Sequence, residues 1–408
     1  MQAAQLAFEW TNQMTKLNGK RKLHFSAIFI TFFVVAGMAG DSRSQTRGAF
    51  QVPKFQVDPF WPKPLPNHWV LGSVTGVAVD RNDHIWIVHR GADSLGNNEK
   101  GGILKPPTGC CVPAPPVLEF DQAGNLLAHW GGPGTGYDWP STTGGITVDQ
   151  KGNVWIAGAG QPEPAAGQTR AGAAAASRPQ DAQVLKFSPA GEFLLQIGHA
   201  GKVEGNDSKT GFNRPANVSV DTQANEVYVT DTGNRRVVVF DADTGAYKRH
   251  WGAYGEKPDE SSLPAYEPNA PFAKQFRAVS GAAIAADGSV YVCDRSNNRI
   301  QVFKKDGKFV KEVSVSKGTL GDGSVWSVAL SHEPTQRMIY VADGQDKKIL
   351  VLRRDTLETV GSFGDGGRMP GQFYAVGSVA VDRKGNVYTG ETYEGKRVQK
   401  FVYKGSGR

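Results

Sequence analysis

Cysteine is scarce in this chain, because the 408 residues include only three: Cys110, Cys111 and Cys293. Three thiols are too few for the disulfide framework that holds small secreted domains together, so a disulfide-rich scaffold is excluded. The adjacent Cys110 and Cys111 can close a vicinal disulfide, one of them can reach Cys293, or the three can be free buried thiols. The sequence leaves these alternatives open.

Helical periodicity is almost missing as well. Apolar residues rarely recur at the spacing of an amphipathic helix, whereas Val, Ile, Phe, Tyr and Trp gather in short runs among 50 Gly and 23 Pro. This composition predicts an all-β fold that is rich in turns.

One longer apolar run stands near the start of the chain. Residues 25–38 follow a basic cluster at residues 20–22. The run is short for a spanning helix, which needs about 20 apolar residues. Residues 1–40 are therefore predicted to be a signal peptide, with an uncleaved N-terminal anchor as the alternative. Export to the periplasm or the medium follows from this prediction, and contact with a membrane is expected only if the segment is not cleaved.

No block of like charge follows the first forty residues. The whole chain carries a formal net charge of +7, of which residues 1–40 contribute three, so about +4 remains on the rest. Basic and acidic residues alternate along that part, which favours solubility and excludes a nucleic-acid face. A dinucleotide fingerprint, a phosphate loop and a Ser-His-Asp set are absent too.

A repeated pattern is what the sequence does contain. A short strand such as GVAVD or GITVD recurs six times, each copy followed by a turn and a second strand such as HIWIVHR or EVYVTDTGNRR, and then by a third. The six opening strands are residues 76–80, 145–149, 217–221, 281–285, 327–331 and 378–382. Periods of this length are typical of propellers, so we predict an all-β, six-bladed β-propeller.

Closure of the ring follows from a count of fourth strands. Five are found, at residues 126–130, 193–197, 247–251, 309–313 and 358–363, and the chain ends before a sixth. An open ring would leave an exposed sheet edge, so residues 50–57 are expected to pair with the last blade. We therefore divide the chain into a signal segment (1–40), an N-terminal arm with the closing strand (41–71) and the propeller (72–408).

Two insertions interrupt the repeats. Residues 161–181 form a tract of Ala, Gly, Pro and Gln, which is typical of a solvated loop. Residues 92–116 hold Cys110 and Cys111 and leave directly from the strand that bears Arg90, so this insertion is a candidate lid.

The motifs EVYVTDTGNRRVVVFD and SVYVCDRSNNRIQVF resemble NHL repeats, and the resemblance covers most of residues 72–403. Within that group, LGSVTGVAVDRNDHIWIVHRGAD and GNVYTGETYEGKRVQKF look most like the peptidyl-hydroxyglycine amidating lyases and their secreted bacterial relatives. This resemblance implies a central channel that holds zinc on three histidines, with arginines and a tyrosine near the scissile carbon.

The zinc ligands of those lyases do not carry over to this chain. The three matching positions are Gly144, Ser280 and Gly377, none of which binds zinc as imidazole does. The equivalent positions of the other blades are Thr75, Ala216 and Trp326. The lyase tyrosine is also missing, because Thr232 and Gly233 stand there.

Two arginines do match the lyase pattern. Arg90 in VHRGAD and Arg295 in CDRSNNR stand where the resemblance places channel arginines, and paired N–H groups suit a carboxylate or an enolate. A structural role within the D-x-x-N-x-R turn is the alternative for Arg295. His89, next to Arg90, is expected to point the other way, into the core between blades. Glu391 and Tyr393 are further candidates, as an acid or base at the channel mouth.

We therefore hypothesise an exported propeller that binds a peptide, a protein or a small anionic ligand at its channel and top loops. The candidate residues are Arg90, Arg295, Thr75, Ser280, Trp326, Glu391 and Tyr393. A lyase or hydrolase related to the amidating lyases is the alternative. No cofactor is predicted. A zinc, copper or calcium ion is kept as a hypothesis, and Cys110, Cys111 and Cys293 are its candidate ligands.

Overall fold

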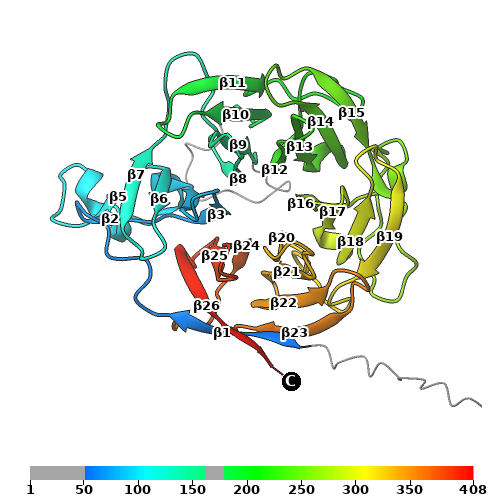
Figure 1. Cartoon of the computed structure of the whole chain (residues 1–408). Helices are drawn as coiled ribbons and strands as arrows, with labels where there is room; N and C mark the ends of the chain where they lie inside the picture. Colours follow the sequence, from blue (N-terminus) through cyan, green and yellow to red (C-terminus); the bar gives the residue numbers. More distant parts are fainter. Residues whose placement is uncertain (1–50, 161–178, 408) are drawn as a thin grey trace, which may run out of the picture. The chain divides into compact units, whose positions relative to one another are not determined.

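The blades predicted from the repeats form a closed ring of six four-stranded antiparallel sheets (Figure 1). The computed structural model describes residues 51–160 and 179–407. The predicted all-β, six-bladed propeller is confirmed. The signal segment and most of the second insertion lie outside the described residues.

Each of the first three blades is built from strands that follow one another along the chain. The first blade contains β3 (Val74–Val79), β4 (Ile85–His89), β6 (Val117–Phe120) and β7 (Leu126–Trp130). The second contains β8 (Thr143–Val148), β9 (Val154–Gly158), β10 (Gln183–Phe187) and β11 (Phe193–Gly198). The third contains β12 (Pro215–Asp221), β13 (Glu226–Asp231), β14 (Arg236–Asp241) and β15 (Tyr247–Trp251).

The remaining three blades include one strand from the start of the chain. The fourth blade contains β16 (Val279–Ile284), β17 (Val290–Asp294), β18 (Arg299–Phe303) and β19 (Phe309–Ser314). The fifth contains β20 (Ser327–Leu330), β21 (Met338–Asp343), β22 (Lys348–Arg353) and β23 (Thr359–Phe363). The sixth contains β24 (Val376–Val381), β25 (Val387–Glu391), β26 (Arg397–Gly407) and β1 (Val52–Asp58).

The outer strand of the sixth blade is therefore β1, which pairs antiparallel with β26 from Val52↔Gly407 to Asp58↔Lys400. The ring of Phe55 packs against Tyr340, Phe363 and Tyr403. These contacts join the two ends of the described chain.

Burial explains why the second strands read as nearly continuous apolar runs. Every residue of β4, β9, β13, β17, β21 and β25 is buried. Each of these strands lies between two neighbouring sheets, as when Trp86 of β4 and Ile156 of β9 share one core cluster. Outer strands such as β7 alternate between exposed and partly buried residues, which is the pattern of a half-solvated sheet edge.

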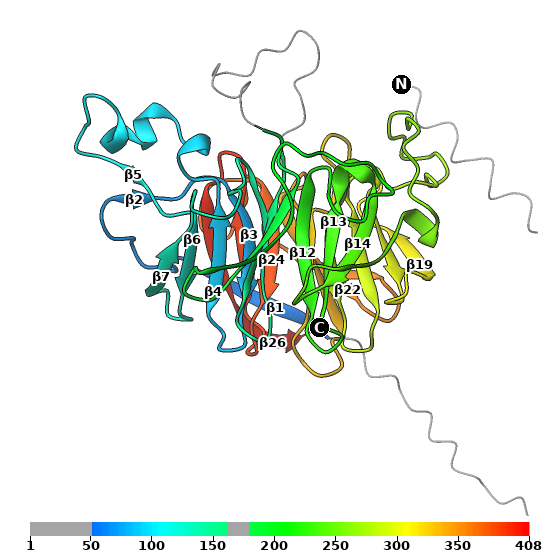
Figure 2. The same cartoon turned by 90° about the horizontal axis from the view of Figure 1, so that it is seen from above.

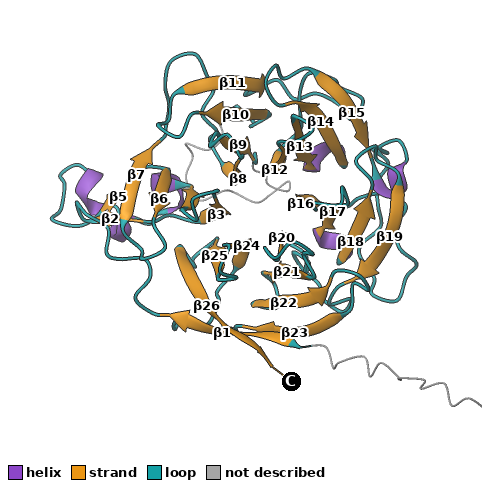
Figure 3. Cartoon of the chain, viewed as in Figure 1, coloured by secondary structure: helices purple, strands orange, loops and turns teal. Residues whose placement is uncertain are grey.

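Helical segments of the described residues are six short 3₁₀ turns (Figure 3). They are η1 (Gly91–Ser94), η2 (Asn97–Glu99), η3 (Gly101–Ile103), η5 (Thr232–Asn234), η6 (Ala253–Gly255) and η7 (Arg295–Asn297). Among the described residues, no helix is long and apolar enough to span a membrane.

The first insertion forms a small lobe beside the first blade, visible at the upper left of Figure 2. It contains η1, η2 and η3, and it is tied down by β2 (Trp69–Val70), which pairs parallel with β5 (Val112–Pro113). An ion pair between Glu99 and Lys396 (2.7 Å) joins the lobe to the loop after β25. The lobe therefore has defined contacts with the sixth blade.

Candidate functional site

The turn after each second strand positions the residue that follows it. In the fourth blade the buried Asp294 accepts hydrogen bonds from the backbone N–H groups of Arg277 and Ala278 and from the side chains of Asn297 and Arg299. Both members of the Asp294–Arg299 ion pair, 2.8 Å apart, are fully buried. The backbone of Arg295 is thereby held rigidly at the end of β17.

In the first blade His89 takes the place of that aspartate. Its Nδ1 accepts hydrogen bonds from the N–H groups of Gly72 (3.1 Å) and Gly91 (3.0 Å), and Nε2 lies 2.9 Å from the Pro115 carbonyl oxygen. His89 is completely buried, and this burial lowers its pKa to about 4. A neutral imidazole that donates from Nε2 fits all three contacts, so His89 is a core residue that supports Arg90.

Arg295 lies over an aromatic platform. Its guanidinium carbon is 4.7 Å from the ring centroid of Trp326, and its Nε is buried with no hydrogen-bond partner in the part of the chain that the structure describes. The indole of Trp326 donates to the carbonyl of Gly323 (2.7 Å), and a Cβ on Gly344 would lie 2.7 Å from the indole ring. The absence of a side chain at Gly344 leaves room for this indole.

Tyr393 stands at the edge of the same platform. Its ring is perpendicular to that of Trp326, with 5.9 Å between centroids, and its hydroxyl donates to Asp322 at 2.8 Å. The backbone of Tyr393 is left-handed (φ 51°), and its carbonyl accepts a hydrogen bond from the Ser73 hydroxyl. The side chain is 46% exposed, so it can contact a ligand.

The charges around Tyr393 link the first and fourth blades. Burial raises the pKa of its hydroxyl, and the hydrogen bond to Asp322 raises it further, while the positive charges of Arg295 and Arg90 act in the opposite direction. In a ring of six, these arginines come from opposite blades. We call Arg90, Arg295, Asp322, Trp326 and Tyr393 the arginine site.

Three of the predicted residues do not join this site through their side chains. Thr75 Oγ1 lies 3.2 Å from the Thr143 hydroxyl, and Ser280 donates to the Val325 carbonyl, so both hydroxyls join neighbouring blades. Glu391 is completely buried.

The contacts of Glu391 explain its place. Its carboxylate accepts from the Tyr374 N–H and from the side chains of Arg397 and Gln399. It therefore takes the structural position that Asp294 holds in the fourth blade. The structure does not place Glu391 as an acid or base at the mouth of the ring.

The residues at the three zinc positions do not fit that metal. Gly144 and Gly377 have no side chain, and the Ser280 hydroxyl already bonds to a carbonyl. Neither do the three thiols assemble. Cys110 and Cys111 form a vicinal disulfide, and Cys293 is a free, fully buried thiol whose pKa is raised by burial.

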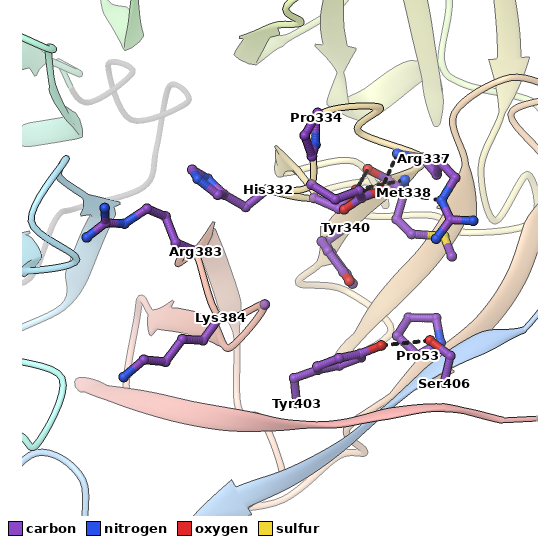
Figure 4. A pocket seen from close by; sticks show the side chains of 13 residues that line it. Pro53, His332, Pro334, Arg337, Met338, Tyr340, Arg383, Lys384, Tyr403 and Ser406 are labelled. Carbon is purple, nitrogen blue, oxygen red and sulfur yellow. Dashed lines mark hydrogen bonds and ion pairs between the residues drawn. The ribbon is translucent and has the colours of Figure 1, made fainter.

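A groove of about 350 Å³ lies at the other end of the blades (Figure 4). It lies between the turn that joins β20 to β21 and the turn that joins β24 to β25, and His332, Arg337 and Tyr403 are among its lining residues. Arg383 at its rim is paired with Asp83 at 3.0 Å. None of the predicted site residues lines this groove.

Sequence reasoning missed Asp322 and the two glycines that frame Trp326. Asp322 stands 71 residues from Tyr393, in the connection between the fourth and fifth blades, where no repeat position marks it. Gly344 could have been found from the sequence, because in the aligned turns it stands where the fourth blade has Arg295 and the third blade has Thr232.

The NHL repeat family model matches residues 212–240 and 276–303. Peptidyl-glycine alpha-amidating monooxygenase A of Xenopus laevis is 26% identical over 249 residues, which cover 60% of this chain and 23% of that protein. NHL repeat-containing protein 3 of Mus musculus is 26% identical over 264 residues, covering 62% of this chain and 58% of that protein. The chain thus spans about a quarter of the length of the amidating monooxygenase.

The solved structures that match this chain do so at low sequence identity. A streptogramin B lyase structure gives a TM-score of 0.49 at 12% identity, covering 86% of this chain and 98% of that chain. A catalytically inactive virginiamycin B lyase from Staphylococcus aureus, solved with quinupristin, gives 0.44 at 13%, covering 86% and 89%. The chain is a six-bladed β-propeller that contains NHL repeats and is related in sequence to the peptidyl-glycine alpha-amidating monooxygenases.

Proposed function

We propose that this protein binds a peptide or a small anionic ligand at the arginine site. The observation that carries the proposal is the Arg295 guanidinium, which lies over Trp326 with its Nε buried and without a hydrogen-bond partner among residues 51–160 and 179–407. A buried donor without a partner costs about 1–3 kcal/mol. Arg295 as a whole is partly exposed, so an anion can approach its guanidinium group.

The arginines of the site favour an anion. The positive charges of Arg295 and Arg90 both act on Tyr393, and the Asp322 carboxylate accepts a hydrogen bond from the Tyr393 hydroxyl. Guanidinium groups present parallel N–H donors that match a carboxylate. The exposed part of Tyr393 offers an aromatic face for an apolar group of the same ligand.

The test measures the affinity of short anionic peptides and small carboxylates for the purified chain by isothermal titration calorimetry. Arg90→Ala and Arg295→Ala are each expected to weaken the best ligand at least tenfold, or about 1.4 kcal/mol. The control is Arg337→Ala, whose side chain is 70% exposed at the other end of the blades. Affinities that stay unchanged in both site variants would refute the proposal.

A second candidate function is a lyase or hydrolase that acts at the same site. It is favoured by the contact of Tyr393 with Asp322 and by relatives whose names state an action on peptidyl-glycine. The raised pKa of Tyr393 keeps its hydroxyl protonated at neutral pH, which suits a hydrogen-bond donor better than a base. For this reason we rank ligand binding first.

A peptide that ends in α-hydroxyglycine separates the two candidates. An enzyme would cleave it, and Tyr393→Phe would abolish turnover while the peptide still binds. Binding without turnover would support ligand binding and contradict the enzyme.

We also propose that the protein is exported. The Cys110–Cys111 disulfide supports export because disulfides persist in oxidising compartments. N-terminal sequencing of the mature protein tests this proposal.

A further inference from the structure

Three potential metal ligands meet at the end of the first blade that lies away from Arg90. Asp80 follows β3, His84 precedes β4, and Glu119 lies on β6. The Nδ1 of His84 is 2.7 Å from Glu119 Oε1 and 3.8 Å from Asp80 Oδ2. The side chains of His84, Asp80 and Glu119 are 31%, 8% and 14% exposed, so the cluster is largely enclosed but open to solvent on the side of the imidazole.

The same three positions hold different residues in two other blades. In each of those blades an asparagine amide donates a hydrogen bond to the aspartate, at 3.1 and 2.8 Å. An aromatic side chain donates to the same aspartate. A lysine amine lies over the ring of that aromatic side chain. The residues are Asp149, Asn153 and Lys186 in the second blade, and Asp382, Asn386 and Lys400 in the sixth. A lysine therefore supplies the positive charge at this position in both blades.

The first blade keeps the aspartate and the aromatic ring but reverses the charge of the third residue. Trp86 donates to Asp80 Oδ2 at 3.2 Å, and Glu119 pairs with Trp86 in the register where the other blades have lysine. Asp80 Oδ1 accepts the N–H groups of Asn82 and His84. Two carboxylates thus face one imidazole, and no lysine is present to balance them.

The consequence is a deficit of positive charge in a partly buried place. The side chains of Asp80 and Glu119 are only 8% and 14% exposed, and both carboxylates lie within 4 Å of the one imidazole of His84. A divalent cation would balance both carboxylates at once.

We propose that Asp80, His84 and Glu119 bind a divalent transition-metal ion of the zinc type. Bonds of about 2.0–2.2 Å in tetrahedral geometry place ligand atoms about 3.3–3.6 Å apart, and the two distances from His84 Nδ1 lie on either side of that range. One imidazole nitrogen with two carboxylate oxygens suits zinc better than calcium, which prefers oxygen ligands alone. Water would fill the remaining position on the exposed side of His84.

The experiment uses the untagged chain, stripped with chelator and dialysed, and measures zinc by isothermal titration calorimetry and by thermal unfolding. We expect one Zn²⁺ per chain and a higher melting temperature with zinc. A double variant, His84→Asn with Glu119→Lys, restores the arrangement of the second and sixth blades. It is expected to bind zinc at least tenfold more weakly than the native chain. Its melting temperature should equal that of the native chain without metal.

Two further variants keep the test decisive. His332→Ala removes an exposed histidine elsewhere and should bind zinc like the native chain. Glu119→Gln preserves side-chain shape and replaces the double variant if the latter does not fold. Absence of zinc binding by the native chain, or equal binding by the Glu119 variants, overturns the proposal. Ligand binding at the arginine site should be the same in all these variants, which separates this site from the proposed function.

Discussion

At the scale of single residues, a close backbone approach holds the arginine site together. Gly323 has φ 81°, and a Cβ added to it would lie 2.1 Å from the carbonyl oxygen of Arg295. Its own carbonyl accepts the indole N–H of Trp326. Gly323 therefore fixes the relative position of the guanidinium and the ring beneath it.

We expect Gly323→Ala to destabilise the protein and to weaken anion binding, because the new methyl group must push Arg295 away from Trp326. Gly405→Ala is the matched control, since Gly405 has φ 87° but nothing within 4 Å of an added Cβ. The positive φ costs each variant about 1–2 kcal/mol, and the contact adds about 1–3 kcal/mol to the first alone. Equal denaturation midpoints for the two variants would contradict this account of Gly323.

The sequence indicated Arg90, Arg295, Trp326 and Tyr393 as candidates, but it gave neither Asp322 nor the contacts among these residues. The resemblance to the amidating lyases identified Arg90 and Arg295, and in the structure both follow the last residue of a second strand. The contact between Tyr393 and Asp322 depends on how the fifth and sixth blades pack, which no local pattern encodes. The structural role of Glu391 could have been predicted, since Glu391 aligns with Asp294 at the first position of the turn.

At the scale of elements, the buried aspartate at the turn after the second strand pairs with an arginine in some blades and has other partners in another. Asp231 and Asp294 each pair with a fully buried arginine. In the fifth blade Asp343 is equally buried, yet among the described residues its carboxylate accepts hydrogen bonds from the Ser316 hydroxyl and the Asp346 N–H. Burial raises the pKa of Asp343 to about 7.

This difference predicts a pH dependence. The folded chain keeps a proton on Asp343 that the unfolded chain loses above pH of about 3.8, so the stabilising contribution of that proton falls as pH rises from about 4 to 7. Asp343→Asn removes the titration. Its stability relative to the native chain should rise between pH 5 and pH 8 by more than about 1 kcal/mol. Denaturant titrations at both pH values measure the free energy of unfolding of the variant and of the native chain. The same change with pH in both chains would refute the prediction.

Strand positions followed from the repeats because each blade repeats the same order of strands and turns along the chain. The positions of the strands in the lobe did not follow from the repeats. β2 and β5 are only two residues long, and the segment between them, residues 71–111, includes β3, β4 and most of the first insertion. Such short strands form only because the surrounding blades hold the two segments side by side.

At the scale of the whole molecule, stability depends on ring closure by β1. Phe55→Ala removes the ring that packs on Phe363 (4.5 Å between centroids) and Tyr340, so we expect a loss of about 2–4 kcal/mol. Phe60→Ala is the control, because Phe60 is 86% exposed. Thermal unfolding compares them, and equal melting temperatures would mean that closure contributes little.

The ring brings residues from the first, fourth, fifth and sixth blades to one end, which is the central claim of this account. A crystal structure of the chain with its tightest anionic ligand tests that claim most directly. We predict that the anionic group lies within about 3 Å of the Arg90 and Arg295 guanidinium nitrogens, with the rest of the ligand against Tyr393. A ligand found instead in the groove beside Tyr403, at the other end of the blades, would contradict it.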